Sequence, residues 1–330
     1  MALVLGIEST AHTFGVGIAK NGKILANVKD TYTTEKGGII PIEAAKHHRE
    51  KANEIYDKAI QDSGINEKDI TAIAFSQGPG LAPCLIEGLK FTKKLSSKLK
   101  KPVIPVNHCI AHLEIGKITG SKDPVMLYTS GANTQVVAYS SGKYRIFGET
   151  LDIGVGNFID NFARYINLGF PGGPKIQKLA EAGKNYIELP YTVKGMDIAL
   201  SGILTNLKQK VESSKYSIED LSYSMQETVF AMLIEVAERA LAYTNKKELL
   251  LAGGVACNSR LKEMARKMCE GRIKKTKLFV PDNSLLTDNG AMIAYAGEVM
   301  FKSGIKVLDI SKLDIKPRQR TDEVDISWRK

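Results

Sequence analysis

The same order of apolar segments occurs twice along this chain, and this recurrence limits the possible folds more than any other feature. Each half opens with three strand-like runs and continues with alternating helix-like and strand-like segments. The three runs occupy residues 3–8, 14–20 and 23–29 in the first half and 125–131, 134–140 and 144–151 in the second. Two similar α/β lobes with a cleft between them explain this pattern, and ligands usually bind in such clefts.

Three segments are predicted along the chain: an N-terminal lobe over residues 1–122, a C-terminal lobe over 123–304 and a polar, basic tail over 305–330. The length of 330 residues, 43% of them hydrophobic, is sufficient for two cores. The boundary falls in residues 116–124, whose Gly, Ser and Pro content is typical of a linker. The tail is expected to be partly loose.

The net charge of +10 favours an anionic partner such as RNA. Two stretches, 90–101 and 260–277, are especially rich in lysine and arginine. Both are also amphipathic, so an ordinary solvated helix face explains their charges equally well. The charge pattern alone therefore leaves nucleic-acid binding open.

The four cysteines have no spacing typical of a disulfide framework, and none belongs to a CxxC motif. No apolar run reaches the length of a membrane-spanning helix, and the first residues resemble a buried strand rather than a signal peptide. These features predict a reduced, cytoplasmic protein without a membrane segment.

His108 and His112 are four residues apart and would lie on one face of a helix. Zinc peptidases use a similar pair, but there a glutamate follows the first histidine and acts as general base. Cys109 stands at that position here, so the segment offers two metal ligands and no base. Two imidazoles bind iron or zinc weakly without further ligands.

Three glycine-rich turns follow strand-like runs, at residues 129–134, 170–174 and 252–260. Glycine lets the backbone approach a phosphate closely, and three such turns in one lobe favour a nucleotide site. Asn258 could contact a base or ribose, but a helix N-cap requires the same side chain. Asp288 likewise has two possible roles, as a metal ligand or as a helix cap.

Nine segments in this order match one known family: GIESTAHTFGVGI, QGPGL, NHCIAH, YTSGANT, GNFIDNFAR, GFPGGP, SGILTNL, LAGGVACNSRL and TDNGAMIAY. The chain resembles the archaeal and eukaryotic Kae1 proteins and their bacterial TsaD relatives, which are threonylcarbamoyl transferases of tRNA t6A synthesis. The resemblance implies the ASKHA fold of hexokinase, actin and the Hsp70 ATPase, with two ribonuclease H-like lobes around a cleft. The matching segments extend from residue 6 to residue 295.

The resemblance also implies the site residues. The metal ligands for Fe²⁺ or Zn²⁺ would be His108, His112, Tyr128 and Asp288. The adenine-nucleotide or acyl-adenylate site would consist of Tyr128, Thr129, Ser130, Gly131, Ala132, Asn133, Asp160, Gly173, Gln177 and Asn258. Glu8 and His12, in the first hairpin, are the candidates for accepting a proton from the substrate amine.

Two positions depart from the family pattern. Ala132 replaces a second glycine and adds a methyl group beside the phosphate loop, and Gln177 replaces a glutamate and loses a charge near the expected ribose. The implied reaction is transfer of the threonylcarbamoyl group from threonylcarbamoyl-AMP to N6 of adenosine 37 in tRNAs that read ANN codons. The implied partners are tRNA and the KEOPS subunits Bud32, Cgi121 and Pcc1.

Alternative functions remain open at this point. A metallopeptidase would need a base that the histidine segment lacks. A sugar or acetate kinase of the same fold would not need the histidine pair. A non-catalytic scaffold that binds ATP would keep its function when the metal ligands are replaced.

Overall fold

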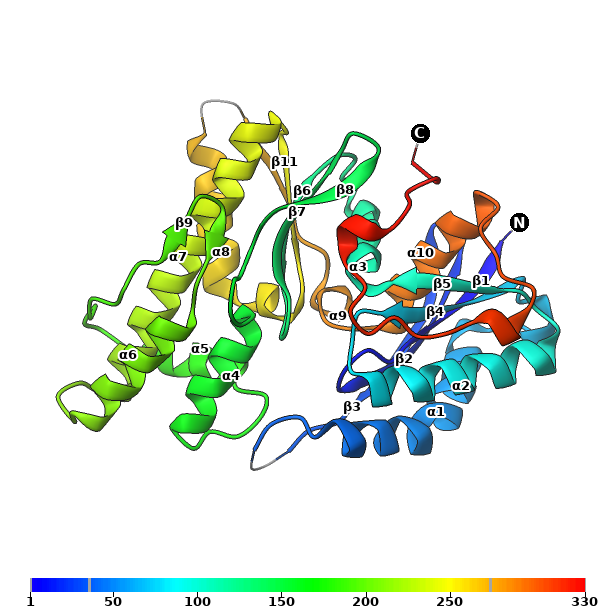
Figure 1. Cartoon of the computed structure of the whole chain (residues 1–330), viewed down its shortest axis with the longest axis horizontal. Helices are drawn as coiled ribbons and strands as arrows, with labels where there is room; N and C mark the ends of the chain where they lie inside the picture. Colours follow the sequence, from blue (N-terminus) through cyan, green and yellow to red (C-terminus); the bar gives the residue numbers. More distant parts are fainter. Residues whose placement is uncertain (1, 35–36, 273–274, 330) are drawn as a thin grey trace.

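The computed structural model describes residues 2–34, 37–272 and 275–329 and contains two five-stranded sheets. The strand orders are β3-β2-β1-β4-β5 and β12-β11-β6-β7-β8. In each sheet the first three strands along the chain are antiparallel, and the last two add parallel strands beside the first. The two sheets therefore have the same topology, as the recurrence in the sequence predicts, and they form the cores of the two lobes in Figure 1.

The first sheet has apolar residues on both faces because helices cover both. Its strands are β1 (Leu3–Glu8), β2 (Thr13–Lys20), β3 (Lys23–Thr31), β4 (Ala72–Gly78) and β5 (Val103–Asn107). Leu5 and Ile7 point into the core beneath α1 (Pro41–Ser63) and α2 (Ala82–Leu99), while Val4 belongs to the core on the opposite face. The tight turn between β2 and β3 is present, with positive φ at Asn21 and Gly22.

The second sheet packs its broad face against five helices. Its strands are β6 (Val125–Thr129), β7 (Thr134–Ser140), β8 (Lys143–Glu149), β11 (Glu248–Ala252) and β12 (Lys277–Phe279). The helices are α4 (Val155–Tyr165), α5 (Gly173–Ala182), α6 (Ser201–Glu212), α7 (Ile218–Thr244) and α8 (Ser259–Gly271), and a small ribbon pairs β9 (Val193–Lys194) with β10 (Asp197–Ile198). None of the helices in the described part of the chain is both long and apolar enough to cross a membrane.

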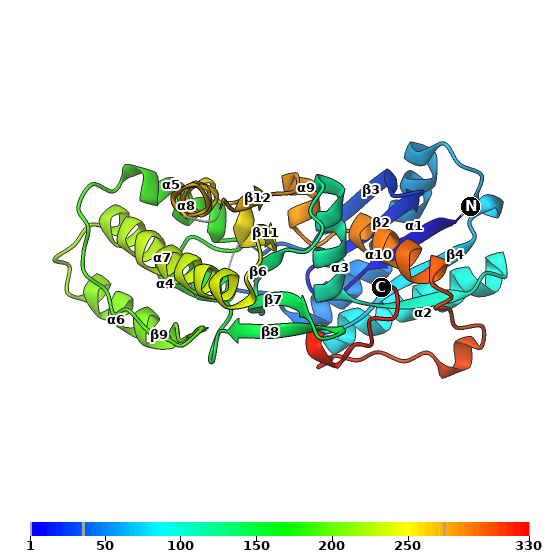
Figure 2. The ribbon, with the colours of Figure 1, turned by 90° about the horizontal axis from the view of Figure 1, so that it is seen from above.

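The short helix α3 (His108–Gly116) lies between the two lobes, and every one of its residues is buried. Ala111 and Ile115 pack toward the first sheet, whereas Ile110 and Leu113 pack toward the second. Figure 2 shows this helix at the junction of the two lobes. A helix surrounded by protein on all sides needs to be apolar all round, so the two histidines in it are the exception.

The helix α10 (Gly290–Lys302) departs from the predicted domain division. It falls within residues 123–304, but Met292 and Ile293 pack on the first sheet, with Ala72 and Ala74. The first lobe is therefore completed by the end of the chain. Glycines permit this packing: a Cβ atom on Gly17 would lie only 2.2 Å from the backbone nitrogen of Ala291.

The tail after residue 304 also differs from the expectation of a loose segment. It pairs with β5 through the bridge between Val103 and Val307, and it buries Leu313 against the first lobe. Farther along, Thr321 and Ile326 are buried against the second lobe. The tail (red in Figure 1) thus connects the two lobes, and we refer to residues 305–329 as the C-terminal strap.

Candidate active site

Two buried histidines on α3 form the centre of the candidate site. The rings of His108 and His112 lie one helical turn apart, with their centroids separated by 4.9 Å. The turn that carries them is fixed by Asn107, whose side-chain oxygen accepts a hydrogen bond from the backbone N–H of Ile110 at 3.1 Å. The N-cap therefore sets where the first histidine projects.

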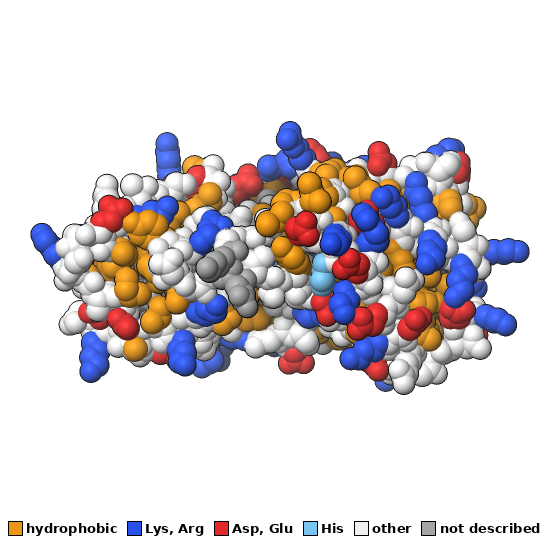
Figure 3. Space-filling view, turned by 90° about the horizontal axis from the view of Figure 1, so that it is seen from below, with side chains coloured by type: hydrophobic (Ala, Val, Ile, Leu, Met, Phe, Trp, Pro, Cys, Tyr) orange, Lys and Arg blue, Asp and Glu red, His pale blue; other side chains and the backbone are white. Residues whose placement is uncertain are grey.

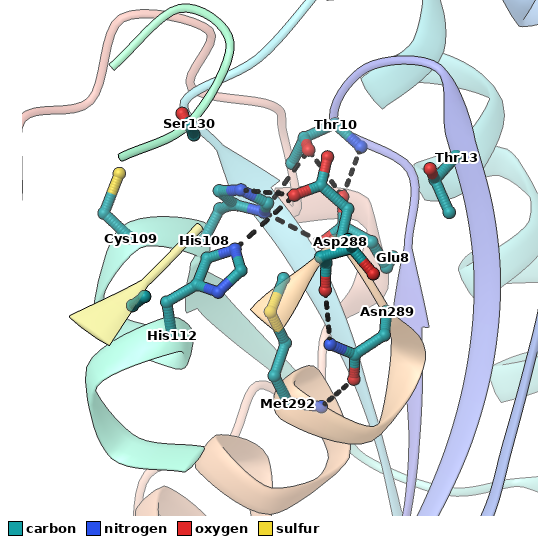
Figure 4. A network of polar contacts seen from close by, with 12 residues as sticks. Glu8, Thr10, Thr13, His108, Cys109, His112, Ser130, Asp288, Asn289 and Met292 are labelled. Atoms are coloured by element: carbon teal, nitrogen blue, oxygen red, sulfur yellow. Dashed lines mark hydrogen bonds and ion pairs between the residues drawn. The ribbon is translucent and has the colours of Figure 1, made fainter. Parts of the chain in front are cut away.

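Asp288 joins the histidines from the segment that precedes α10. One carboxylate oxygen lies 3.5 Å from Nε2 of His108 and 3.4 Å from Nε2 of His112. Figure 4 shows the carboxylate pointing toward both rings. The interpretation of Asp288 as a helix cap is wrong, because Asn289 caps α10 by accepting a hydrogen bond from the N–H of Met292 at 2.9 Å.

Tyr128, at the end of β6, completes the cluster. Its hydroxyl lies 3.1 Å from Nε2 of His108, and its ring centroid lies 5.0 Å from that of His112. The structure therefore brings together all four residues implied as metal ligands. Tyr128 lies on β6 of the second sheet and is therefore the contribution of the C-terminal lobe. Asp288 immediately precedes α10, the helix that completes the N-terminal lobe.

The surroundings of the cluster favour a positive charge. Burial lowers the pKa of His108, but the negative charges of Glu8 and Asp288 outweigh burial and raise it to about 9. Burial raises the pKa of Asp288, but the charge of His108 and the contact with His112 outweigh burial and hold it well below its ordinary value. A bound cation would be stabilised by the same carboxylates.

The ligand set fits a divalent metal. Ligand atoms of His108, His112 and Asp288 all lie within 4.8 Å of one another. Nδ1 of His112 is buried without a hydrogen-bond partner among the described residues, and Nε2 meets the Asp288 carboxylate at 3.4 Å. Burial lowers the pKa of this histidine. A neutral imidazole with a buried, unsatisfied nitrogen is costly unless something binds it, and a metal ion would satisfy it.

Glu8 supports the cluster from within the protein and is not among the residues that line the inter-lobe cavity. Its side chain has no solvent exposure, and one oxygen accepts hydrogen bonds from the backbone and hydroxyl of Thr10 at 2.6 and 2.5 Å. The other oxygen accepts from Nδ1 of His108 at 3.0 Å. A carboxylate can only accept, so Glu8 fixes the proton of His108 on Nδ1 and turns Nε2 toward Asp288.

A cavity of about 1080 Å³ separates the two lobes at this point. It is lined by His108, Tyr128 and Asp288 of the cluster and by His12 from the first hairpin. The Nδ1 atom of His12 is buried without a hydrogen-bond partner among the described residues, and its ring meets Phe170 edge-on at 5.3 Å. Of the two candidate proton acceptors, His12 is therefore the one that reaches the cavity.

The predicted nucleotide residues line the same cavity with one exception. Those that do so are Tyr128, Ser130, Gly131, Ala132, Asn133, Asp160, Gly173, Gln177 and Asn258. Thr129 instead points into the protein, where its hydroxyl donates to the carbonyl of Ala252 at 3.2 Å and links β6 to β11. Its side chain is fully buried, so its role is structural.

Several of these residues also hold the loops in place. The side-chain oxygen of Asn258 caps α8 by accepting from the N–H of Arg260 at 2.8 Å, which confirms the cap interpretation without removing the residue from the cavity wall. The amide nitrogen of Gln177 donates to Ser259 at 3.0 Å. Burial raises the pKa of Asp160, which accepts a hydrogen bond from the N–H of Gly172 at 2.8 Å.

Two cationic residues of the cavity wall were missed by the sequence analysis. Lys29 lies on β3, and Arg164 lies at the end of α4. Arg164 ends the matching segment GNFIDNFAR, but the resemblance assigned it no role. Lys29 belongs to no matching segment, and a lysine near the end of a hairpin strand is indistinguishable in sequence from a solubilising surface residue. Their positions follow only from the way the two lobes meet.

The fold and the site define a class: two sheets of equal topology, with a ligand cavity and a cluster of metal-binding side chains between them, are the two-lobed ASKHA architecture. Solved structures agree on the fold. HypF from T. kodakarensis superimposes with a TM-score of 0.64 at 16% identity, over 94% of this chain and 49% of that one. The activator of the 2-hydroxyisocaproyl-CoA dehydratase from Clostridium difficile gives 0.53 at 13% identity, over 92% and 98%.

Sequence comparison identifies the family within this class. The family model of TsaD, tRNA N6-adenosine threonylcarbamoyltransferase, matches residues 23–295. Proteins with that name from Thermococcus sibiricus and Thermococcus kodakarensis are 56% and 55% identical over 326 residues, which is 99% of this chain and 100% and 99% of theirs. The chain belongs to the TsaD family and is a transferase that places the threonylcarbamoyl group on N6 of adenosine in tRNA.

A longer relative from Thermoplasma volcanium is named a probable bifunctional tRNA threonylcarbamoyladenosine biosynthesis protein. It is 51% identical over 327 residues, covering 99% of this chain and 61% of the relative. In that protein the unit described here is joined to additional chain.

Proposed function

We propose that the transfer takes place in the cavity between the lobes, from threonylcarbamoyl-AMP to adenosine 37 of tRNAs that read ANN codons, with a divalent metal held beside the acyl group. The observation that carries this proposal is the cluster of His108, His112, Tyr128 and Asp288, of which all but His112 line the cavity. A buried ligand set that opens onto a substrate cavity is the arrangement expected of a catalytic metal site.

The metal would be Fe²⁺ or Zn²⁺, since imidazole, phenolate and carboxylate suit both. When bound, it would supply Lewis-acid polarisation of the threonylcarbamoyl carbonyl. Glu8 keeps the His108 ring in one orientation through the 3.0 Å contact to Nδ1. The cluster contains no general base of the kind that a metallopeptidase needs, which disfavours the peptidase alternative.

The protein's own residues position the reactants. Ser130, Gly131 and Asn133 line the cavity in the loop after β6, where the adenylate phosphate would lie. Hydrogen bonds between Ser130 and Asn133 hold this loop in shape. The amine N6 attacks the carbonyl carbon, the bond from this carbon to the phosphate oxygen breaks, and AMP leaves. The amine must lose a proton, and we assign its acceptance to the unpaired Nδ1 of His12.

The partners belong to the same proposal. We assign the KEOPS subunits Bud32, Cgi121 and Pcc1 as partners, and the reduced cytoplasm as the compartment, in keeping with four free cysteines. The start of α1 and of α2 exposes Ile40, Ile42 and Ile86 by 53%, 73% and 40%. Exposed apolar side chains of this kind support docking of Pcc1 on α1, and Ile42→Lys should prevent its co-purification.

The test is a reconstituted reaction with this chain, its partners, threonylcarbamoyl-AMP and tRNA, with the modified nucleoside measured by mass spectrometry. Asp288→Asn and His112→Ala should lose metal by elemental analysis and lose transfer. The control His47→Ala, on α1 and paired with Asp30 away from the cavity lining, should lose neither. His12→Asn should keep its metal and lower kcat by roughly 10²–10⁴-fold. Full activity of Asp288→Asn without bound metal would refute the metal-assisted reaction.

A further inference from the structure

Lys29 connects the first hairpin to the segment that carries the metal ligand. Its side chain leaves β3 and lines the inter-lobe cavity. The ammonium nitrogen donates to the backbone carbonyl of Asp288 at 3.1 Å and to the hydroxyl of Thr287. An ammonium group has three N–H donors, and the structure directs these two at uncharged acceptors.

Lys29 lines a ligand cavity without an ion pair, unlike four other shielded cations of the described residues. Lys117, Lys246, Arg272 and Arg329 are also largely shielded, with side chains 21%, 11%, 12% and 14% exposed, and each lies within 4.0 Å of a carboxylate. Among the ion pairs of the described residues, none includes Lys29. Shielded cations normally have an anionic partner, so this one has a place for an anion from outside the chain.

The neighbouring acids do not fill that place. The carboxylate of Asp288 faces the two histidines, and both oxygens of Glu8 are occupied by Thr10 and His108. Burial lowers the pKa of Lys29, and the attraction of Asp288 and Glu8 offsets this only in part. An anion bound at the ammonium would stabilise the positive charge that burial destabilises.

We propose that Lys29 binds an oxyanion of the acyl donor in the inter-lobe cavity, beside the metal ligands, an inference that rests on the proposed use of threonylcarbamoyl-AMP. The donor carries two such groups, the carboxylate of the threonine part and the phosphate of the adenylate. Cys257, in the glycine-rich turn of the opposite lobe, lines the same cavity. Lys29 therefore faces the space between the metal ligands and that turn.

The experiment compares Lys29→Met with Lys29→Arg and with the control Lys23→Met, an exposed lysine of the same strand. Loss of a charge-assisted contact should raise the KM for threonylcarbamoyl-AMP roughly tenfold or more in Lys29→Met, with partial recovery in Lys29→Arg and no change in the control. Calorimetry with AMP identifies the group: weaker AMP binding assigns the phosphate, and unchanged AMP binding assigns the carboxylate.

Two results would overturn the inference. One is an unchanged KM in Lys29→Met. The other is a loss of bound metal in Lys29→Met that accounts for the rise in KM, because Lys29 would then only hold the backbone of Asp288. If the wild-type protein does not use threonylcarbamoyl-AMP at all, the proposed function fails instead, so the two failures are distinguishable.

Discussion

Replacing Gly17 by alanine tests how closely α10 is fitted to the first sheet. A Cβ atom at this position would lie 2.2 Å from the backbone nitrogen and 2.4 Å from the Cα of Ala291. Both atoms are backbone, so no side-chain rotation relieves the contact, and the helix would have to retreat by close to an ångström. Overpacking in a dense core typically costs about 1–3 kcal/mol, and we expect the free energy of unfolding to fall by the upper part of that range.

The same retreat should affect the metal site. Ala291 is three residues from Asp288, so a displaced α10 would move the carboxylate away from the histidines. We expect Gly17→Ala to bind less metal than the wild type even though residue 17 contacts no ligand. Urea unfolding followed by circular dichroism gives the first quantity, and elemental analysis of the folded protein gives the second.

A matched control uses a glycine with open space around it. No atom lies within 4 Å of a Cβ built on Gly202, in the first turn of α6. Gly202→Ala should therefore leave stability unchanged or raise it by about 0.5 kcal/mol, because alanine loses less conformational entropy in a helix. If Gly17→Ala is as stable as the wild type and as Gly202→Ala, there is room for a methyl group between α10 and the first sheet. That result would refute the argument from close packing.

Three further predictions concern other parts of the molecule. Burial lowers the pKa of His48 to about 4. Below about pH 6.5 the unfolded chain therefore binds more protons than the folded one, and the free energy of unfolding falls by up to about 1.4 kcal/mol for each pH unit of acidification. His48→Gln should flatten this slope in urea titrations between pH 7 and 4. Charge reversal at Lys93 and Lys94 should reduce the salt dependence of tRNA binding by the assembled complex, by about 0.7–0.9 in the log–log slope for each phosphate that is no longer neutralised; an unchanged slope would assign these lysines to solubility. Trp328→Phe removes the donor that lies 3.1 Å from the buried carboxylate of Glu114 and should cost about 1–3 kcal/mol, measured by thermal unfolding.

The basic stretches illustrate why charge counts alone could not place the tRNA surface. In residues 90–101, Lys90 and Lys98 are paired with Glu87 and Glu67, and in 260–277, whose residues 273–274 lie outside the described part, Arg260 is paired with Glu227. Figure 3 shows lysines and arginines mixed with acidic side chains on the face it displays. Glu87 lies on the same helix as Lys90, but Glu67 and Glu227 come from other elements, so their effect is invisible in a linear count.

The strands and hairpins were predictable because their signals are local. The alternation of apolar runs located both sheets, and Asn21-Gly22 adopts the positive φ values that a tight turn requires. In contrast, the apolar pattern of α10 shows that it is buried but not on which sheet, because that choice depends on glycines more than 270 residues away in the sequence.

The candidate site was predictable only in part, for a similar reason. The spacing of His108 and His112 suggested a ligand pair, but nothing local distinguished Asp288 from a cap, since Asn289 beside it performs that task. Thr129 and Gly131 are two residues apart on the same loop, yet one is buried and the other lines the cavity. Which side of the backbone faces a ligand is decided by tertiary packing.

The late position of α10 in the sequence has a consequence for synthesis on the ribosome. The first lobe lacks one of its covering helices until residue 302 has been made, so the face of its sheet that carries Val4 and Ala74 stays uncovered while the second lobe is translated. At roughly 5–20 residues per second this interval lasts roughly 10–40 seconds. Asp288 arrives in the same final segment, so a chain interrupted before that point has the histidines but not the carboxylate. Nascent fragments therefore bind the metal weakly, and completion of the first lobe and assembly of the metal site coincide.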